Sequence, residues 1–157
     1  MITTKSRYAL RAVIDIARHQ DTGSVRRSDI ARRQEIPRHY LERILLLLKE
    51  GGILRSRKGP GGGFVLGRPP DAMAAWDVIE AVGEGKPALE CLSTRTPGCR
   101  RSGTCETRAI WARLHNVVKA DMSEIRLSEI LSGKVGARLG RDLESLLAGA
   151  DRGSPTR

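Results

Sequence analysis

The chain has 157 residues and a formal net charge of +10, from 28 Lys and Arg against 18 Asp and Glu. This length predicts one domain, with at most a small appendage, and a core that needs no disulfide bonds for support. No run approaches the ~18 apolar residues of a membrane span, and charged residues interrupt the apolar positions of the N-terminal segment. We therefore expect no signal peptide, no membrane partner and a cytoplasmic protein.

The positive charge is concentrated in one part of the chain. Residues 1–70 hold fifteen Lys and Arg against six Asp and Glu, a net of +9, whereas residues 71–157 hold thirteen against twelve, a net of +1. Such asymmetry predicts a polyanion partner for the basic part. Nucleic acid is favoured over a membrane surface, because the basic residues do not lie opposite one broad apolar helix face.

Two helices are expected first. Apolar residues at helical spacing predict one over residues 4–19, with Thr3 or Thr4 as its cap, and the sequence DTG ends it. A shorter helix follows at about 27–34 and ends before Pro37, because the residue before a proline avoids the helical region.

A third helix is expected from about Pro37 to Glu50, with Gly51 and Gly52 as its stop. Its inward apolar set is Leu41, Ile44, Leu45, Leu47 and Leu48.

The hydrophobic period then changes to that of strands. Residues 53–58 and 64–66 predict a hairpin whose tip is the sequence GPGGG. This tip is not typical of a nucleotide-binding loop, because Phe64 and Val65 stand where the lysine and hydroxyl of such a loop are required. Three helices and a hairpin, all basic, predict a winged helix-turn-helix, in which the third helix enters the major groove and the hairpin wing reaches the minor groove or backbone.

The second part of the chain is expected to be helical. Asp71 would cap a helix at about 72–83, a long helix would run over about 106–125, and Ser128 would cap a last short one. The long helix carries one apolar stripe: Ile110, Trp111, Leu114, Val117, Val118, Met122 and Ile125. The stripe is wider than a single helix over a small domain needs, so we expect it to pair with a second copy.

The expected fold class is therefore mostly α with a small β-hairpin wing, a winged helix-turn-helix plus a long dimerisation helix. We divide the chain into a DNA-binding domain at 1–70, a cysteine loop with dimerisation helices at 71–132, and a disordered tail at 133–157.

All three cysteines, Cys91, Cys99 and Cys105, lie in one polar stretch, ECLSTRTPGCRRSGTCE at 90–106. Buried structural cysteines are usually found in apolar segments, so packing does not explain this cluster. The neighbouring arginines favour deprotonated thiols, and three thiolates fit iron–sulfur chemistry. Bare redox-active thiols remain an alternative, as does a zinc or structural role, although zinc would need a fourth ligand and the loop has no histidine.

Several polar side chains are expected to contact DNA, four of them in the first two turns of the third helix. Arginine suits the guanine edge and a carboxylate suits cytosine N4. An ordinary solvated helix face is the plain alternative, above all for Glu42, because a carboxylate near phosphates is unfavourable without a base partner or a cation. The expected set is Ser28, Arg38, His39, Tyr40, Glu42, Arg43, Arg57 and Lys58.

Several stretches of the chain resemble the Rrf2 family of bacterial transcription regulators. They are TTKSRYALRA at the start, DIARRQEIPRHYLERIL at 29–45, RSRKGPGGGFVLGRPP at 55–70 and the cysteine loop ahead of a long helix. The resemblance covers about residues 1–132. It implies a homodimer that pairs its long helices, a four-iron or two-iron cluster near that interface, and a winged helix that binds a pseudo-palindromic DNA operator.

The resemblance also assigns roles to residues. Cys91, Cys99 and Cys105 match the family's cluster cysteines, Glu42 matches a carboxylate that reads bases in some members, and Lys58 stands where a wing arginine is frequent. The C-x7-C and C-x5-C spacings are similar to those of the family's iron regulators.

Departures from the family pattern concern the operator and the fourth cluster ligand. Pro37 and His39 replace frequent serines of the recognition helix. Arg7 and Arg108 stand where different branches of the family supply the ligand, which leaves as candidates Glu90, Glu106, a small thiol or a solvent molecule.

The expected function is a cluster-dependent DNA-binding regulator, a repressor of operons for iron, cluster assembly or nitrosative stress. Two alternatives remain: a thiol-based redox regulator without a cluster, and an iron–sulfur carrier or electron-transfer protein. We expect no enzyme, because the sequence contains no Ser/His/Asp grouping, HExxH or paired-carboxylate pattern.

Overall fold

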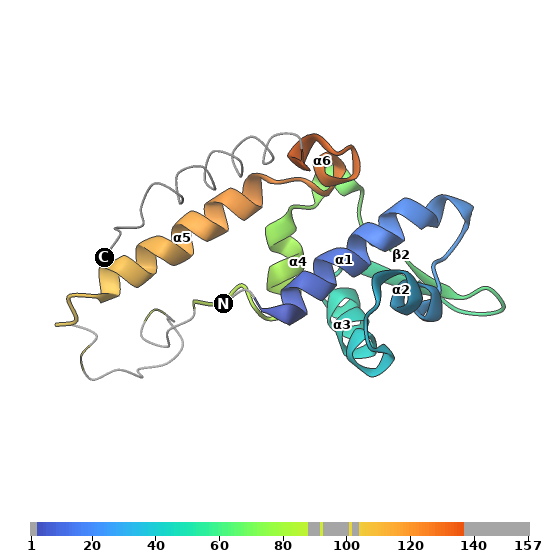
Figure 1. Ribbon diagram of the computed structural model, residues 1–157, viewed down its shortest axis with the longest axis horizontal. Helices are drawn as coiled ribbons and strands as arrows, with labels where there is room; N and C mark the ends of the chain where they lie inside the picture. The colour runs from blue at the N-terminus through green and yellow to red at the C-terminus, as the bar shows by residue number, and fades with distance from the viewer. Residues whose placement is uncertain (1–2, 88–91, 93–100, 102–103, 137–157) are drawn as a thin grey trace, which may run out of the picture.

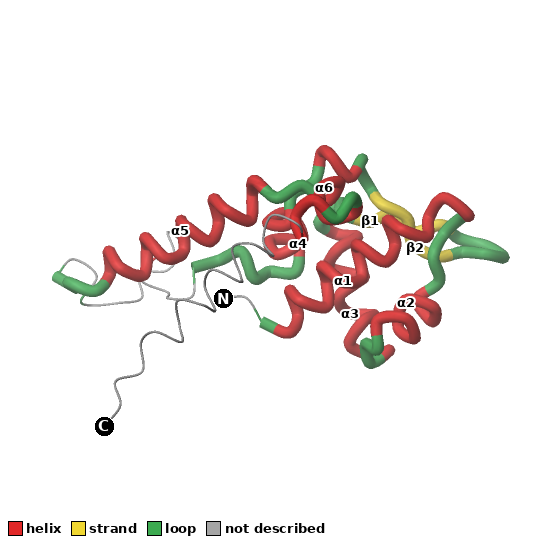
Figure 2. Tube along the Cα trace, turned by 45° about the horizontal axis from the view of Figure 1, so that its top comes forward, coloured by secondary structure: helices red, strands yellow, loops and turns green. Residues whose placement is uncertain are grey.

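The computed structural model describes residues 3–87, 92, 101 and 104–136. This part of the chain is helical apart from one two-stranded antiparallel hairpin, which confirms the expected fold class (Figures 1 and 2). The helices are α1 (Thr4–His19), α2 (Arg27–Gln34), α3 (Arg38–Glu50), α4 (Ala75–Ala81), α5 (Arg108–Glu124) and α6 (Leu127–Leu131), and the strands are β1 (Leu54–Arg57) and β2 (Gly63–Leu66).

The three expected N-terminal helices are confirmed by α1, α2 and α3. Thr3 caps α1, because its hydroxyl accepts a hydrogen bond from the Lys5 N–H at 3.1 Å. The α2 helix ends at Gln34, the next residue, Glu35, has a left-handed φ of 51°, and α3 begins directly after Pro37.

The core lies where α1, α2 and α3 meet. Its largest fully buried side chains from these helices are Val13, Ile16, Ile30, Leu41, Ile44, Leu45 and Leu48. The four from α3 line one side of that helix, so its opposite side is turned to solvent.

The wing is held to the helices by a third segment. Val25 and Phe64 exchange two backbone hydrogen bonds of 2.9 Å, which extends the β1–β2 hairpin by one bridge. Gly63 allows this approach, because a Cβ there would collide with the carbonyl of Val25. Gly59 and Gly61 at the tip have positive φ angles of 100° and 83°, as a glycine-rich wing tip requires.

The prediction that Asp71 caps a helix starting at 72 is wrong. Residues 70–72 form a 3₁₀ turn, and α4 starts at Ala75. The Ala75 N–H donates to the Ile125 carbonyl at 2.9 Å, so the chain is extended just before α4. Asp77 then supplies the cap, because its carboxylate accepts a hydrogen bond from the Ala74 N–H at 3.0 Å.

The long helix is confirmed as α5, but the predicted Ser128 cap of the next helix is wrong. The Leu127 N–H donates a hydrogen bond of 2.9 Å to the Met73 carbonyl, which keeps Arg126 extended. The Glu129 carboxylate accepts a hydrogen bond of 2.9 Å from the Arg126 N–H and so caps α6. Residues 137–157, most of the expected tail, lie outside the described residues. No helix in the described residues is long and apolar enough to cross a membrane.

Candidate nucleic-acid interface and cysteine site

The outward side of α3 presents a row of polar side chains. Arg38, His39, Glu42 and Arg43 are all exposed, at spacings that place them on one side of the helix. Because the apolar side of α3 is packed into the core, rotation of the helix about its axis is prevented. The structure thus brings together four of the residues expected to contact DNA.

Tyr40 belongs to the same helix but is half-buried. Its ring and that of Tyr8 on α1 pack edge to face, with centroids 5.8 Å apart. Arg7 and Arg11 lie over the Tyr8 ring at 5.5 and 5.7 Å. Tyr40 therefore fixes α3 against α1, and its expected contact with DNA stays a prediction.

Glu42 has a cationic partner that the sequence did not reveal. Its carboxylate lies 2.5 Å from Arg27 Nη1 of α2, and both side chains are exposed. Arg27 is therefore a cation of the kind that a carboxylate requires near DNA phosphates. No sequence spacing signals a contact between residues fifteen positions apart on two helices.

The remaining DNA-contact candidates lie at the same end of the molecule. Ser28 is exposed in the first turn of α2, and Arg57 and Lys58 are exposed where β1 enters the wing tip. Figure 1 shows α2, α3 and the hairpin grouped there, away from α5. This grouping can present the helix and the wing to one DNA duplex.

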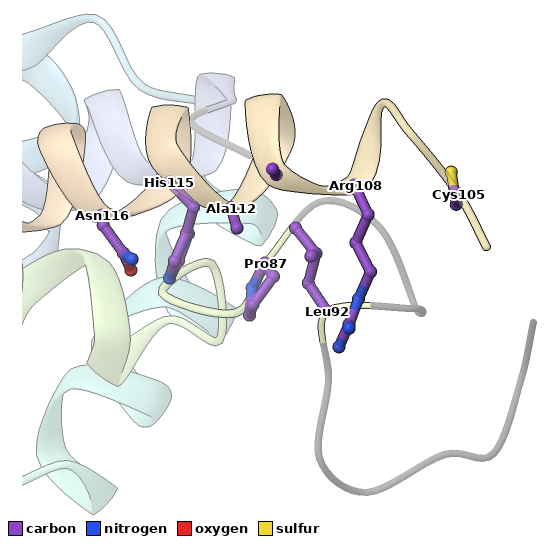
Figure 3. A pocket seen from close by; sticks show the side chains of 8 residues that line it. Pro87, Leu92, Cys105, Arg108, Ala112, His115 and Asn116 are labelled. Carbon is purple, nitrogen blue, oxygen red and sulfur yellow. The ribbon is translucent and has the colours of Figure 1, made fainter. Parts of the chain in front are cut away.

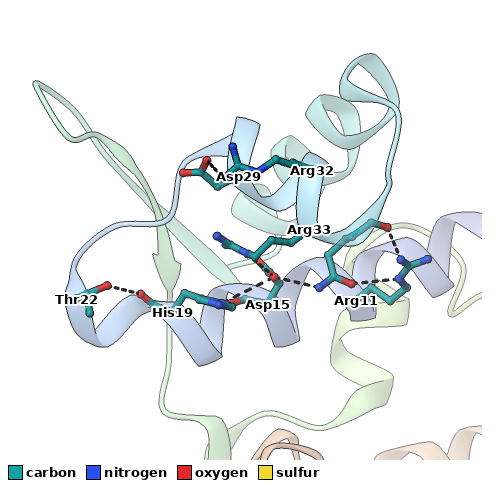
Figure 4. A network of polar contacts seen from close by, with 8 residues as sticks. Arg11, Asp15, His19, Thr22, Asp29, Arg32 and Arg33 are labelled. Carbon is teal, nitrogen blue, oxygen red and sulfur yellow. Dashed lines mark hydrogen bonds and ion pairs between the residues drawn. The ribbon is translucent and has the colours of Figure 1, made fainter.

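A buried carboxylate fixes the angle between α1 and α2 (Figure 4). Asp15, 2% exposed, accepts hydrogen bonds from Arg33 Nε at 2.9 Å, Arg33 Nη2 at 2.6 Å and Gln34 Nε2 at 3.0 Å. Burial alone would raise the pKa of Asp15, but these hydrogen bonds, with the charges of Arg33 and His19, lower it below the ordinary value. Sequence reasoning missed this network, since a single Asp in an amphipathic helix carries no signal of burial.

Of the three cysteines, Cys105 alone lies in the described residues; Cys91 and Cys99 are outside them. Cys105 stands just before α5, with its sulfur 3.4 Å from the Thr107 hydroxyl oxygen. The hydrogen bond with the Thr107 side chain lowers the pKa of the Cys105 thiol most, followed by backbone N–H groups at the start of α5 and the charge of Arg101. Deprotonation to the thiolate, the form that binds metal, is therefore easier for Cys105 than for an ordinary cysteine.

Cys105 also borders a pocket of about 550 Å³ along α5 (Figure 3). The described lining residues are Pro87, Leu92, Cys105, Arg108, Ala109, Ala112, His115 and Asn116. The ring of His115 and that of Trp76 on α4 pack in a T-shaped arrangement, with centroids 5.8 Å apart. The pocket therefore joins the cysteine site to the α4–α5 contact.

The segment that leads into the cysteine loop is tied to the start of α1. Glu84 accepts hydrogen bonds from the N–H groups of Thr3 at 3.1 Å and Ser6 at 3.2 Å, and from both of their hydroxyls. Lys5 Nζ lies 3.8 Å from the same carboxylate, whose side chain is 9% exposed. Sequence reasoning did not identify Glu84.

A second cavity, of about 320 Å³, lies between Glu84 and α3. It is lined by Thr3, Lys5, Tyr40, Arg43, Ile44, Leu47 and Glu84. Glu84 and residues of α3 therefore border the same cavity.

The apolar stripe of the long helix is divided by the structure. Val118 and Met122 are half-buried and Ile125 lies beyond the end of α5, 5% exposed. The other four remain exposed: Ile110 at 64%, Trp111 at 45%, Leu114 at 54% and Val117 at 57%. Ile125 was therefore wrongly assigned to a surface for a second copy, whereas the other four form an exposed apolar row.

The helical core, the β-wing and the basic outward side of α3 define a winged-helix DNA-binding protein. Comparison with known families gives the particular one. Residues 2–133 match the Rrf2 family, described as an iron-dependent transcriptional regulator. The chain belongs to the Rrf2 family of transcriptional regulators, as its sequence motifs indicated.

Individual relatives agree with this assignment. The chain is 35% identical to a helix-turn-helix-type transcriptional regulator of Haemophilus influenzae over 93% of this chain and 97% of the relative. It is 36% identical to the transcriptional regulator IscR of Erwinia tasmaniensis over 85% of this chain and 79% of that protein.

Solved structures show the same fold. CymR, the global cysteine regulator of B. subtilis, has a TM-score of 0.67 at 30% identity, covering 84% of this chain and 96% of that chain. IscR of T. potens has a TM-score of 0.66 at 25% identity, covering 85% of this chain and 88% of that chain.

Proposed function

We propose that this transcriptional regulator senses iron or redox state through an iron–sulfur cluster held by Cys91, Cys99 and Cys105. The observation that carries the proposal is the thiolate-favouring position of Cys105 at the start of α5, in a chain similar to IscR. We assign DNA binding to residues 1–70, and cluster sensing and dimerisation to residues 71–132. The proposal places the protein in the cytoplasm and assigns it no catalytic step.

The donor set fits the group. Three thiolates are ordinary ligands of two-iron and four-iron clusters, and nearby arginines offset the negative charge that they bring. When bound, the cluster would supply iron that responds to oxygen, nitric oxide or iron supply. Two carboxylates near the cysteines in sequence, Glu106 and Glu90, are candidates for the fourth ligand. Glu106, next to Cys105, is exposed.

DNA binding is assigned to α3 and the wing. Arg38, His39 and Arg43 would meet base edges, Arg27 would balance the charge of Glu42, and the wing residues would bind phosphates. Two winged domains in a homodimer would then require a pseudo-palindromic operator, with half-sites one or more helical turns apart. We assign the dimer contact to the exposed row Ile110, Trp111, Leu114 and Val117.

A thiol-based regulator without a cluster is the second candidate. Oxidants attack the thiolate of a cysteine, and the lowered pKa of Cys105 makes its thiolate easier to form. The structural similarity to CymR of Staphylococcus aureus, whose structure is known in an oxidized form, favours this candidate as well.

Anaerobic reconstitution with iron and sulfide, followed by visible spectroscopy and native mass spectrometry, separates the candidates. We expect a visible chromophore and a cluster mass that disappear when any one of the three cysteines is replaced by Ala. Operator affinity should also fall steeply with salt, by about 0.9 in log–log slope per phosphate contact. DNA binding by a colourless reconstituted protein would favour the thiol regulator, and a coloured protein without DNA binding would favour the carrier.

A further inference from the structure

One leucine of α3 is exposed on the surface instead of packed into the core. Five large apolar side chains in the described residues are strongly exposed, and four of them form the row on α5. The fifth is Leu46 on α3, which is 53% exposed. A single exposed leucine is ordinary on a protein surface, so its significance depends on where it lies.

Leu46 continues the polar row that we assign to DNA. Counted from His39, Glu42, Arg43 and Leu46 follow at three, four and seven positions, which places all four on one side of the helix. The buried residues of α3 fix this side outward. At about 1.5 Å per residue, the row is about 10 Å long, or about three base-pair steps.

The surroundings of Leu46 are charged rather than apolar. Arg43 precedes it by one helical turn, Lys49 follows by one, and both are exposed. Glu42 and Glu50, four residues before and after Leu46, are exposed as well, and a surface this charged is unsuited to an apolar protein partner. The apolar group that a base pair presents in the major groove is the C5-methyl of thymine.

We propose that Leu46 contacts the C5-methyl group of one operator thymine and so determines specificity at that base pair. The proposal rests on the assignment of α3 to the major groove. Burial of one methyl group corresponds to about fourfold in affinity. Neither Arg43 nor Glu42 can provide this discrimination, because their side chains recognise hydrogen-bonding edges.

The test uses duplexes selected by the wild-type protein from a randomised library. Each thymine of the selected site is replaced in turn by deoxyuridine, which removes only the methyl group and leaves base pairing intact. Dissociation constants are measured at one salt concentration for wild type, Leu46→Ala and Leu46→Met. Methionine keeps an apolar chain of similar length and is the matched control.

We expect one thymine per half-site at which deoxyuridine weakens wild-type binding about fourfold. The effect should persist in Leu46→Met and vanish in Leu46→Ala, while the other thymines show no difference between variants. The proposal is overturned if no thymine shows the effect, or if it remains undiminished in Leu46→Ala. Loss of repression by Leu46→Ala with unchanged binding to every duplex would also overturn it and assign Leu46 to a protein partner. If no duplex is selected at all, the assignment of α3 fails instead.

Discussion

Replacing Glu84 by Gln removes the charge that ties the cysteine-loop segment to α1. The carboxylate is 9% exposed and accepts hydrogen bonds from Thr3 and Ser6 at the positive end of the helix, beside Lys5. A charge in such a partly buried position contributes up to ~2 kcal/mol, and each hydrogen bond to a charged group about 1.5–3 kcal/mol. Gln keeps one acceptor, so we expect the free energy of unfolding near pH 7 to fall by about 2 kcal/mol.

The loss should depend on pH in one direction. Burial would raise the pKa of Glu84, but hydrogen bonds from Ser6 and Thr3, with the charge of Lys5, lower it below the ordinary value. A depressed pKa stabilises the folded state fully above the unfolded pKa of about 4.3, and this stabilisation is lost as the pH falls through the folded value. The difference between wild type and Glu84→Gln should therefore be constant near neutrality and shrink in acid.

Urea unfolding at fixed protein concentration, followed by circular dichroism near pH 7 and near pH 3.5, measures both effects. Glu80→Gln is the matched control, because Glu80 is an exposed carboxylate near the end of α4 and its loss should change stability by less than about 0.5 kcal/mol. A Glu84→Gln protein as stable as this control, or a deficit that does not shrink in acid, would show that the Glu84 charge does not stabilise the folded state.

Three further changes test other contacts. Asp15→Asn should lower the free energy of unfolding by about 2–3 kcal/mol at neutral pH, because Arg33 loses its buried partner; urea titrations should show the deficit shrinking below the unfolded pKa of about 3.9, since the pKa of Asp15 is lowered by folding. Arg27→Ala should weaken operator binding, and in an Glu42→Gln background the loss should be smaller by about 1 kcal/mol; a double-mutant cycle with no coupling would contradict a role for the pair in DNA binding. Leu114→Asp should give monomers in sedimentation, and a dimer as tight as wild type would contradict the assigned contact surface.

Local sequence signals predicted the DNA-binding part well. Thr3 is a helix cap, Pro37 separates two helices, and glycines allow the positive φ angles of the wing tip; each acts within a few residues. Predictions failed where distant segments set the local structure. The starts of α4 and α6 are fixed by hydrogen bonds between residues about fifty positions apart, which overrode the expected caps Asp71 and Ser128.

The candidate site was predictable by residue type more than by contact. Arginines on the third helix indicated DNA binding, and clustered cysteines indicated a metal or redox site. Three contacts depend on how distant segments pack, and no sequence spacing predicts them. They are the buried Asp15–Arg33 hydrogen bonds, the Arg27–Glu42 ion pair and the hydrogen bonds of Glu84 to the start of α1. Leu46 is absent from the predicted inward set of α3, and its 53% exposure agrees with that prediction.

If the cysteines control DNA binding, operator affinity must differ between the protein with and without its cluster. The comparison is between anaerobically reconstituted protein and the Cys91→Ala, Cys99→Ala and Cys105→Ala apoproteins, at one salt concentration. A cluster shifts the DNA-competent population only by its differential affinity for the two states, and such coupling usually amounts to about 1–3 kcal/mol, or roughly 5–150-fold. We expect the loaded protein to bind more tightly by a factor in this range. Equal affinity of the loaded protein and all three apoproteins would contradict the account.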